Sequence, residues 1–129
     1  MPATSATQLV QFFSQFEELE LAVLIGSRAN GHAHAASDWD FAIQWNKSIP
    51  PLDALGLSES LRLQLARQLD TSPELIDLIN IPTARLAMRA VITDEGALLK
   101  GDNTLAWSHL LLRTWAELEE FEWERQHAA

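Results

Sequence analysis

The sequence predicts an α/β (α+β) domain in which helices pack on a small mixed β-sheet. Hydrophobic residues make up 47% of the 129-residue chain, which is enough for a packed core. Stretches with apolar side chains at helical spacing alternate with short apolar or strictly alternating runs. The resulting order, α-β-β-α-β-α-α, is typical of a sheet covered by helices. The length suits one domain spanning residues 1–129.

The first half of the chain is expected to hold one helix and two strands. A capping box at Ser5–Gln8 and apolar residues at helical spacing predict an amphipathic helix over residues 6–18. Residues 21–25 form a short apolar run and predict a buried strand. The small, polar residues 26–37 predict a loop with at most one helical turn. Residues 38–45 alternate, which predicts a half-buried strand. Its apolar face is expected to carry Trp39, Phe41, Ile43 and Trp45.

The middle of the chain predicts a helix, a strand and a second helix. Leucines recur every four residues from Leu57 to Leu69 and predict a helix that ends near Asp70. Residues 74–79 predict a third strand, with Asp77 on the same face as two apolar residues. Pro82 suits the first position of a helix that runs to about residue 90 or 91.

The C-terminal part predicts a turn, a short apolar piece and a long helix. The turn is expected at residues 94–96 and the apolar piece at 97–99. Residues 101–103 are expected to break the chain and cap a last helix, which runs to about Arg125. One stripe of that helix is expected to pack on the sheet. Its members are Trp107, Leu111, Trp115 and Leu118.

Charge and composition exclude several classes of protein. The formal net charge of −9 disfavours direct nucleic-acid binding, because affinity for phosphate backbones comes from Lys and Arg. It is compatible with divalent cations or a basic protein partner, although solubility alone is the favoured explanation of such a charge. Cysteine is absent, so disulfides and thiolate metal sites are excluded and a cytoplasmic location is expected. Neither a membrane span nor a secretory signal is evident, so no membrane partner is expected.

Two short motifs flank the polar loop. Gly26-Ser27 follows the first strand, where glycine allows a ligand close to the backbone, and the amides and the Ser27 hydroxyl can donate to phosphate oxygens. Asp38 and Asp40 begin the second strand and point to the same side. Two adjacent carboxylates repel each other unless a cation lies between them, and their oxygens suit Mg²⁺ or Mn²⁺. The alternatives are an ordinary turn and a solvated strand face.

Asp77 is a third candidate because it lies between Ile76 and Leu78. A buried charge is unfavourable unless something compensates it, and a neighbouring metal site would do so. The alternative is an exposed position on an edge strand. His32 and His34 could bind a transition metal, but no third soft ligand is evident, so a polar loop over a nucleotide is the preferred interpretation.

Together these residues resemble the signature of the DNA polymerase beta-like nucleotidyltransferase superfamily. That signature is Gly-Ser, ten residues, then Asp-x-Asp, here Gly26-Ser27 and Asp38-x-Asp40. Asp77 lies where the family places its third carboxylate, on a later strand. The resemblance implies the polymerase beta-like nucleotidyltransferase fold, with Mg²⁺ or Mn²⁺ as cofactor and ATP as substrate. Asn30 departs from a frequent Arg, and Trp39 from the usual aliphatic residue.

The short chain is most similar to the minimal nucleotidyltransferases, and within them to MntA-type antitoxins. Such antitoxins transfer AMP from ATP to a tyrosine of a HEPN-domain ribonuclease toxin, so a toxin partner in a hetero-oligomer is implied. The resemblance makes Asp38, Asp40 and Asp77 the catalytic and metal-binding residues. It assigns Gly26, Ser27 and Arg28 to the nucleotide, although a surface role for Arg28 is equally compatible. The alternatives are adenylylation of an antibiotic-type small molecule and neutralisation by binding alone.

The last helix also suggests a contact for the partner. Trp123 lies among glutamates near the end of the chain, where little core is expected. An aromatic ring surrounded by acidic groups suits a basic partner such as an RNA-cleaving toxin. The alternative is that Trp123 folds back onto the first helix.

Overall fold

A four-stranded mixed sheet forms the centre of the computed structural model, which describes residues 5–31, 33 and 37–128. The strands follow in the spatial order β3-β2-β1-β4. Strand β1 is antiparallel to both β2 and β4, whereas β2 and β3 are parallel. The strands are β1 (Leu19–Ile25), β2 (Trp39–Trp45), β3 (Ile76–Asn80) and β4 (Ala97–Lys100).

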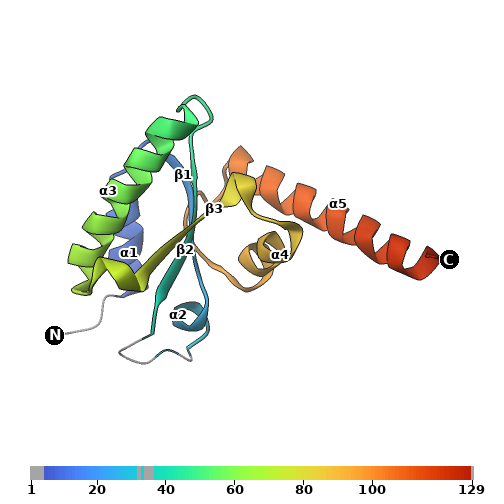
Figure 1. Cartoon of the computed structure of the whole chain (residues 1–129), viewed down its shortest axis with the longest axis horizontal. Coiled ribbons are helices and arrows are strands. Elements are labelled where there is room, and N and C mark those ends of the chain that lie inside the picture. Colours follow the sequence, from blue (N-terminus) through green and yellow to red (C-terminus); the bar gives the residue numbers. More distant parts are fainter. Residues whose placement is uncertain (1–4, 32, 34–36, 129) are drawn as a thin grey trace.

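Helices cover both faces of the sheet (Figure 1). Helices α1 and α3 lie on one side, α4 and α5 lie on the other, and the short α2 lies near the end where β2 begins. The helices are α1 (Ala6–Phe13), α2 (Ser27–Asn30), α3 (Pro51–Leu69), α4 (Leu86–Glu95) and α5 (Leu105–His127). Two 3₁₀ turns, η1 (Pro73–Leu75) and η2 (Ile81–Thr83), flank β3. Of these helices, none combines the length and apolarity that crossing a bilayer requires. The predicted fold class is confirmed.

The core has two layers because side chains on a strand alternate between faces. Phe41, Ile43 and Trp45 of β2 pack with α1 and α3, and Trp39 is partly buried against the same cluster. Ala42 lies in the second cluster, on the α4 and α5 side. The predicted alternation is therefore confirmed within β2, which begins at Trp39 and not at Asp38 as predicted.

The first helix is shorter than residues 6–18. The predicted capping box forms, since Ser5 Oγ accepts from the Gln8 amide at 3.2 Å. The helix ends at Phe13, and the Ser14 hydroxyl donates to the Gln11 carbonyl at 2.6 Å. A hydroxyl that bonds a carbonyl three residues back favours a turn over further helix. The chain then turns, and β1 begins at Leu19, two residues earlier than expected.

The prediction around Pro82 is also wrong in detail. Pro82 lies in the 3₁₀ turn η2, where Asn80 Nδ2 donates to Thr83 Oγ1 at 3.2 Å, and α4 begins only at Leu86. The helix runs to Glu95, so residues 94 and 95 close it and do not form a separate turn. Gly96 follows, and a Cβ there would lie 2.4 Å from Val23 Cγ1, so glycine allows the close passage onto the sheet.

Trp107 packs against the core as predicted, but helix α5 uses only part of the expected stripe. Its buried residues are Leu110 and Thr114, whereas Trp115 is 52% exposed. A helix presents one narrow face to a small sheet, and the row through Leu110 meets it here. The cap is Thr104, whose Oγ1 accepts from the Trp107 amide at 3.3 Å, and not the preceding residues 101–103.

An ion pair joins α5 to α4. The Arg89 side chain is only 5% exposed, and its Nη1 lies 2.5 Å from Glu117 Oε2. Arg89 Nε also donates to the Ala84 carbonyl at 3.1 Å. The hydrogen bond from Arg89 holds the pKa of Glu117 below its usual 4.5, and the charges of Arg89 and Arg113 act in the same direction. Loss of one partner of such a pair leaves a buried charge uncompensated.

We expect Glu117→Gln to lower the melting temperature at pH 7. A carboxyl whose pKa is depressed on folding stabilises the fold above its unfolded pKa, about 4.5, and loses that contribution as the pH falls through the folded value. The difference in melting temperature between the variant and the wild type should therefore disappear at acidic pH. Thermal melts at several pH values test this, with Glu119→Gln as control. Equal melting temperatures at pH 7 would show that the pair does not join the two helices.

Candidate functional site

Three carboxylates lie near one another where β2 and β3 begin. Asp40 and Asp77 are direct neighbours in the parallel register of these strands, so both face the same side of the sheet. The pKa of Asp40 is raised, first by burial and then by the charges of Asp77 and Asp38. Asp77 is exposed on the edge strand, as the alternative interpretation of this residue predicted. It also faces Asp40, as the site interpretation requires.

Gly26 lies directly against Asp40. It follows β1, whose last residue, Ile25, pairs with Asp40 across the sheet. Its φ of +78° lies in the region that favours glycine. A Cβ at this position would lie 2.7 Å from Asp40 Oδ2, closer than such atoms approach. The Gly-Ser turn and the carboxylate are therefore parts of one site, separated by thirteen residues of chain.

The residues after Gly26 form a single helical turn, α2, as the sequence allowed. The Gly26 carbonyl accepts from the amides of Ala29 and Asn30 at 3.0 and 3.3 Å. Ser27 is the first residue of the turn and is half-buried. Amides at the start of a helix have no partner within the helix. Ser27 directly follows Gly26, so its amide and hydroxyl remain the candidates for binding a phosphate.

Arg28 fastens this turn to the start of β2. Its guanidinium carbon lies 4.3 Å from the centre of the Trp39 ring. Its Nη2 donates to the Ser37 carbonyl at 2.9 Å. Both contacts flank Asp38, and the Trp39 ring is in turn parallel to that of Phe41, with centroids 6.1 Å apart. Arg28 thus positions the segment that carries Asp38. The sequence interpretation missed this role for Trp39, although its departure from an aliphatic residue was a signal.

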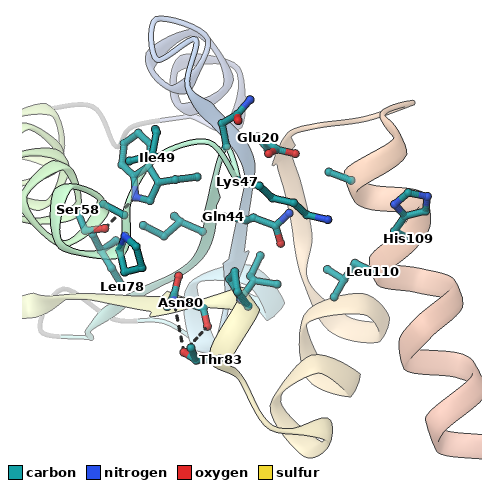
Figure 2. A pocket seen from close by; sticks show the side chains of 18 of the residues that line it. Glu20, Gln44, Lys47, Ile49, Ser58, Leu78, Asn80, Thr83, His109 and Leu110 are labelled. Atoms are coloured by element: carbon teal, nitrogen blue, oxygen red, sulfur yellow. Dashed lines mark hydrogen bonds between the residues drawn. The ribbon is translucent and has the colours of Figure 1, made fainter.

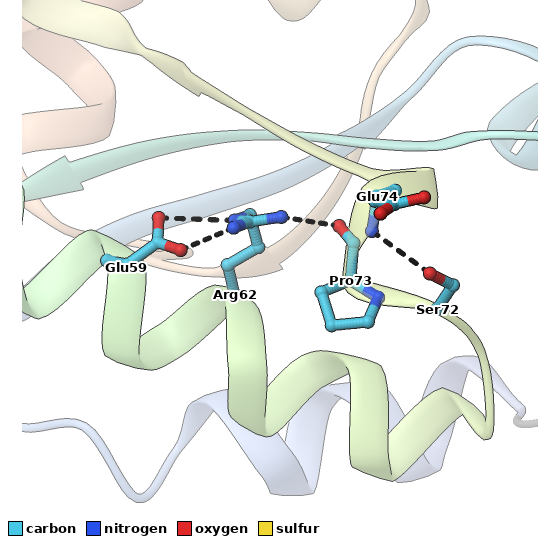
Figure 3. Close-up of polar contacts among 5 residues, drawn as sticks. All are labelled: Glu59, Arg62, Ser72, Pro73 and Glu74. Atoms are coloured by element: carbon cyan, nitrogen blue, oxygen red, sulfur yellow. Dashed lines mark hydrogen bonds and ion pairs between the residues drawn. The ribbon is translucent and has the colours of Figure 1, made fainter.

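A second set of contacts sets the start of β3 (Figure 3). Arg62 on α3 pairs with Glu59 one turn earlier and donates to the Pro73 carbonyl at 2.6 Å. Ser72 Oγ accepts from the Glu74 amide at 3.4 Å. These bonds hold η1, which is why the strand starts at Ile76 and not at residue 74 as predicted. They fix where Asp77 enters the sheet, one residue later.

The charges of these carboxylates would suit a divalent cation. Asp40 is repelled by both neighbouring carboxylates, and a cation between them would remove that repulsion. Among the described residues, no three Asp, Glu or His side chains are grouped so that they could hold a metal ion, so the protein alone offers no metal cage. Mg²⁺ is usually held by one or two carboxylates together with substrate phosphates, so such a cage is not required. His32 and His34 lie outside the described residues.

A separate hollow lies at the other end of the same strands (Figure 2). Its volume is about 830 Å³, and its lining comes from the ends of β2 and β3, the start of α3 and the start of α5. Lys47, His109 and Leu110 are among the side chains that border it. The carboxylates begin β2 and β3, whereas this hollow lies where those strands end. It is not part of the site described above, and the sequence interpretation did not identify it.

Comparisons with known proteins connect this site to a family. The sequence profile described as "Polymerase beta, Nucleotidyltransferase" matches residues 7–104. No curated protein matches the sequence significantly.

Solved structures with the same fold come from toxin–antitoxin complexes. One, with AMP-PNP, has a TM-score of 0.70 and 21% identity, covering 95% of this chain and 93% of that chain. A second contains a tri-AMPylated Shewanella oneidensis HEPN toxin with its MNT antitoxin, with a TM-score of 0.63 and 18% identity over 95% and 93%. A third, MntA-HepT, has a TM-score of 0.61 and 19% identity over 94% and 90%. At these identities the likeness shows the fold.

Proposed function

Because this chain belongs to the polymerase beta nucleotidyltransferase family, we propose that it is an antitoxin that transfers AMP from ATP to a tyrosine of a HEPN-domain ribonuclease toxin. The observation that carries the proposal is the direct contact between the Gly-Ser turn and the carboxylates. Gly26 can approach Asp40 only because it lacks a Cβ. The groups proposed to donate hydrogen bonds to phosphate and the carboxylates proposed to bind the cation therefore lie at one point. An AMPylated toxin in a complex of the same fold supports the choice of acceptor.

The proposed chemistry forms a bond between the tyrosine oxygen and the α-phosphorus of ATP. The bond from that phosphorus to the bridging oxygen breaks, and pyrophosphate leaves. Asp38 and Asp40 would hold Mg²⁺ or Mn²⁺, with Asp77 beside them. When bound, the ions would stabilise the attacking and leaving oxygens. Asp77 is exposed to an incoming acceptor and would accept the tyrosine proton. Gly26 and Ser27 would hold the β- and γ-phosphates.

The acceptor tyrosine has to come from another molecule. The chain contains no tyrosine, so it cannot modify itself on that residue type. A partner protein must therefore bring its hydroxyl to the open side of the carboxylates. The partner that the family resemblance implies, a HEPN-domain ribonuclease, satisfies this need.

Pyrophosphate release distinguishes the proposal from its rivals. The chain is mixed with Mg²⁺ and ATP, first alone, then with a candidate HEPN-domain ribonuclease, then with a panel of hydroxyl-bearing antibiotics. The proposal predicts release only with the protein. Release only with a small molecule would favour an antibiotic-type enzyme. Inhibition of the ribonuclease without any release would favour neutralisation by binding alone.

We expect Ser27→Ala to weaken nucleotide binding without abolishing metal binding. A single neutral hydrogen bond contributes about 0.5–1.5 kcal/mol, and more when its partner is charged. Affinity for a non-hydrolysable ATP analogue should therefore fall about twofold to tenfold or more, measured by calorimetry with Mg²⁺ present. Ser37→Ala serves as control for a serine in the same loop. An unchanged affinity would make Ser27 part of a merely structural turn.

A further inference from the structure

The outer face of α5 carries large apolar side chains that the described part of the chain leaves open. We define this face by four residues that are 52–75% exposed. They are Leu105, Leu112, Trp115 and Trp123. Leu105, Leu112 and Trp123 are separated by close to two and three full helical turns, so they form one stripe, and Trp115 borders it. Leu110 and Thr114, by contrast, are buried against the body.

The last turns of α5 project from the domain. Every residue from 119 to 128 is exposed, and Figure 1 shows the helix leaving the sheet, with the C-terminus far from α1. Trp123 therefore does not fold back onto the first helix. Its ring lies nearly parallel to that of His127, with centroids 4.1 Å apart and an angle of 12°. An aromatic side chain held in this way loses little freedom when a partner covers it.

The negative charge around this face favours a basic partner. Residues 117–127 contain five glutamates and one arginine, and that Arg125 already pairs with Glu122 at 2.8 Å. An acidic surround favours a basic partner, because complementary charge steers association and disfavours like-charged surfaces. A second copy of this chain would bring the same acidic face. Arg113, a cation in the N-terminal half of the helix, already pairs with Glu117, with 3.4 Å between Nε and Oε2.

We infer that the outer face of α5 is the docking surface for a basic face of the protein that supplies the acceptor hydroxyl. The identity of that protein rests on the proposed function. A ribonuclease binds a phosphate backbone through cationic groups, so it carries a face of this kind. The Arg89–Glu117 pair fastens α5 to α4, and α4 packs on the sheet through Ile92. A partner bound to α5 is thereby held in a fixed relation to the carboxylates.

Calorimetry with a HEPN-domain ribonuclease that the chain binds and modifies tests this inference. Leu112→Ala/Trp123→Ala in the full chain should weaken the complex at least about tenfold, because truncated aromatic and aliphatic anchors dominate such interfaces. The melting temperature should not change. Leu52→Ala is the matched control, since that leucine is 82% exposed on α3, and it should bind like the wild type. In AMP transfer, the double variant should raise the KM for the protein and keep kcat.

Several results would overturn the inference. They are an affinity that stays within twofold of the wild type and a large fall in melting temperature. A wild-type dimer in sedimentation that the double variant abolishes would assign the face to a second copy. The proposed function fails separately. If the variant weakens a complex in which no AMP is ever transferred, the docking surface stands and the transfer activity does not.

Discussion

Asp38→Asn/Asp40→Asn should abolish AMP transfer. The two substitutions keep the shape of the side chains and remove the charges that would hold the cations. Loss of several kcal/mol of transition-state stabilisation corresponds to at least about a thousandfold in rate. Transfer of label from α-labelled ATP to the HEPN-domain protein, measured with Mg²⁺ present, checks this result. Full transfer by the double variant would contradict the assignment of Asp38 and Asp40 as cation ligands.

The same variant should fold, and without divalent cations it should be more stable than the wild type at pH 7. The pKa of Asp40 is raised by burial, by Asp77 and by Asp38. A carboxyl with a raised pKa destabilises the fold when it is ionised, so this penalty is complete above the raised value. The advantage of the variant should shrink as the pH falls through that value towards 3.8. Mg²⁺ or Mn²⁺ should stabilise the wild type and not the variant.

Gly26→Ala should reduce transfer about a hundredfold, the second largest effect that we expect. The substitution places a Cβ 2.7 Å from Asp40 Oδ2 at a residue with φ of +78°. Either the turn or the carboxylate must move, and a displacement of about 1 Å at a reacting centre costs roughly a hundredfold in rate. The backbone strain adds about 1–3 kcal/mol of destabilisation. Steady-state kinetics and thermal melts measure the two effects separately.

Gly31→Ala separates the strain from the contact. Gly31 has a similar φ of +80°, but nothing lies within 4 Å of an added Cβ. Its ψ of 8° places Gly31 in the left-handed helical region, whereas Gly26, with a ψ of −160°, lies in a region essentially restricted to glycine. Gly31→Ala should therefore lose less stability than Gly26→Ala and keep most of the activity. If both variants lost activity equally, backbone strain in the loop would be responsible, and the close approach of Gly26 to Asp40 would not be needed for activity.

The elements and motifs that local sequence determines were predicted well. The alternation in β2 and the leucine repeat of α3 reflect the periods of a strand and a helix, which a single sequence shows directly. The proximity of Asp40 and Asp77 was expected only from the family resemblance. Its physical basis is the parallel register of β2 and β3, and register between distant strands is not visible in one sequence. The roles of the carboxylates and of Ser27 stay predictions.

The predictions were wrong where individual side chains determine where a helix begins or ends, or which of its faces packs on the sheet. The Ser14 hydroxyl ends α1 early, and the bond between Asn80 and Thr83 makes a 3₁₀ turn where Pro82 suggested the start of a helix. In α5 the apolar residues surround the whole helix. Periodicity therefore could not show that the row through Leu110 packs inward while Trp115 stays exposed. The support that Arg28 gives to the Asp38 segment depends on a contact across the loop.

Mass spectrometry of the HEPN-domain protein after incubation with this chain, ATP and Mg²⁺ tests the central claim most directly. We expect the partner to gain AMP on a tyrosine and its ribonuclease activity to fall with the modification. Neither change should occur with Asp38→Asn/Asp40→Asn. A partner that forms a complex with the wild-type chain, loses its ribonuclease activity and remains unmodified on every tyrosine would contradict the claim.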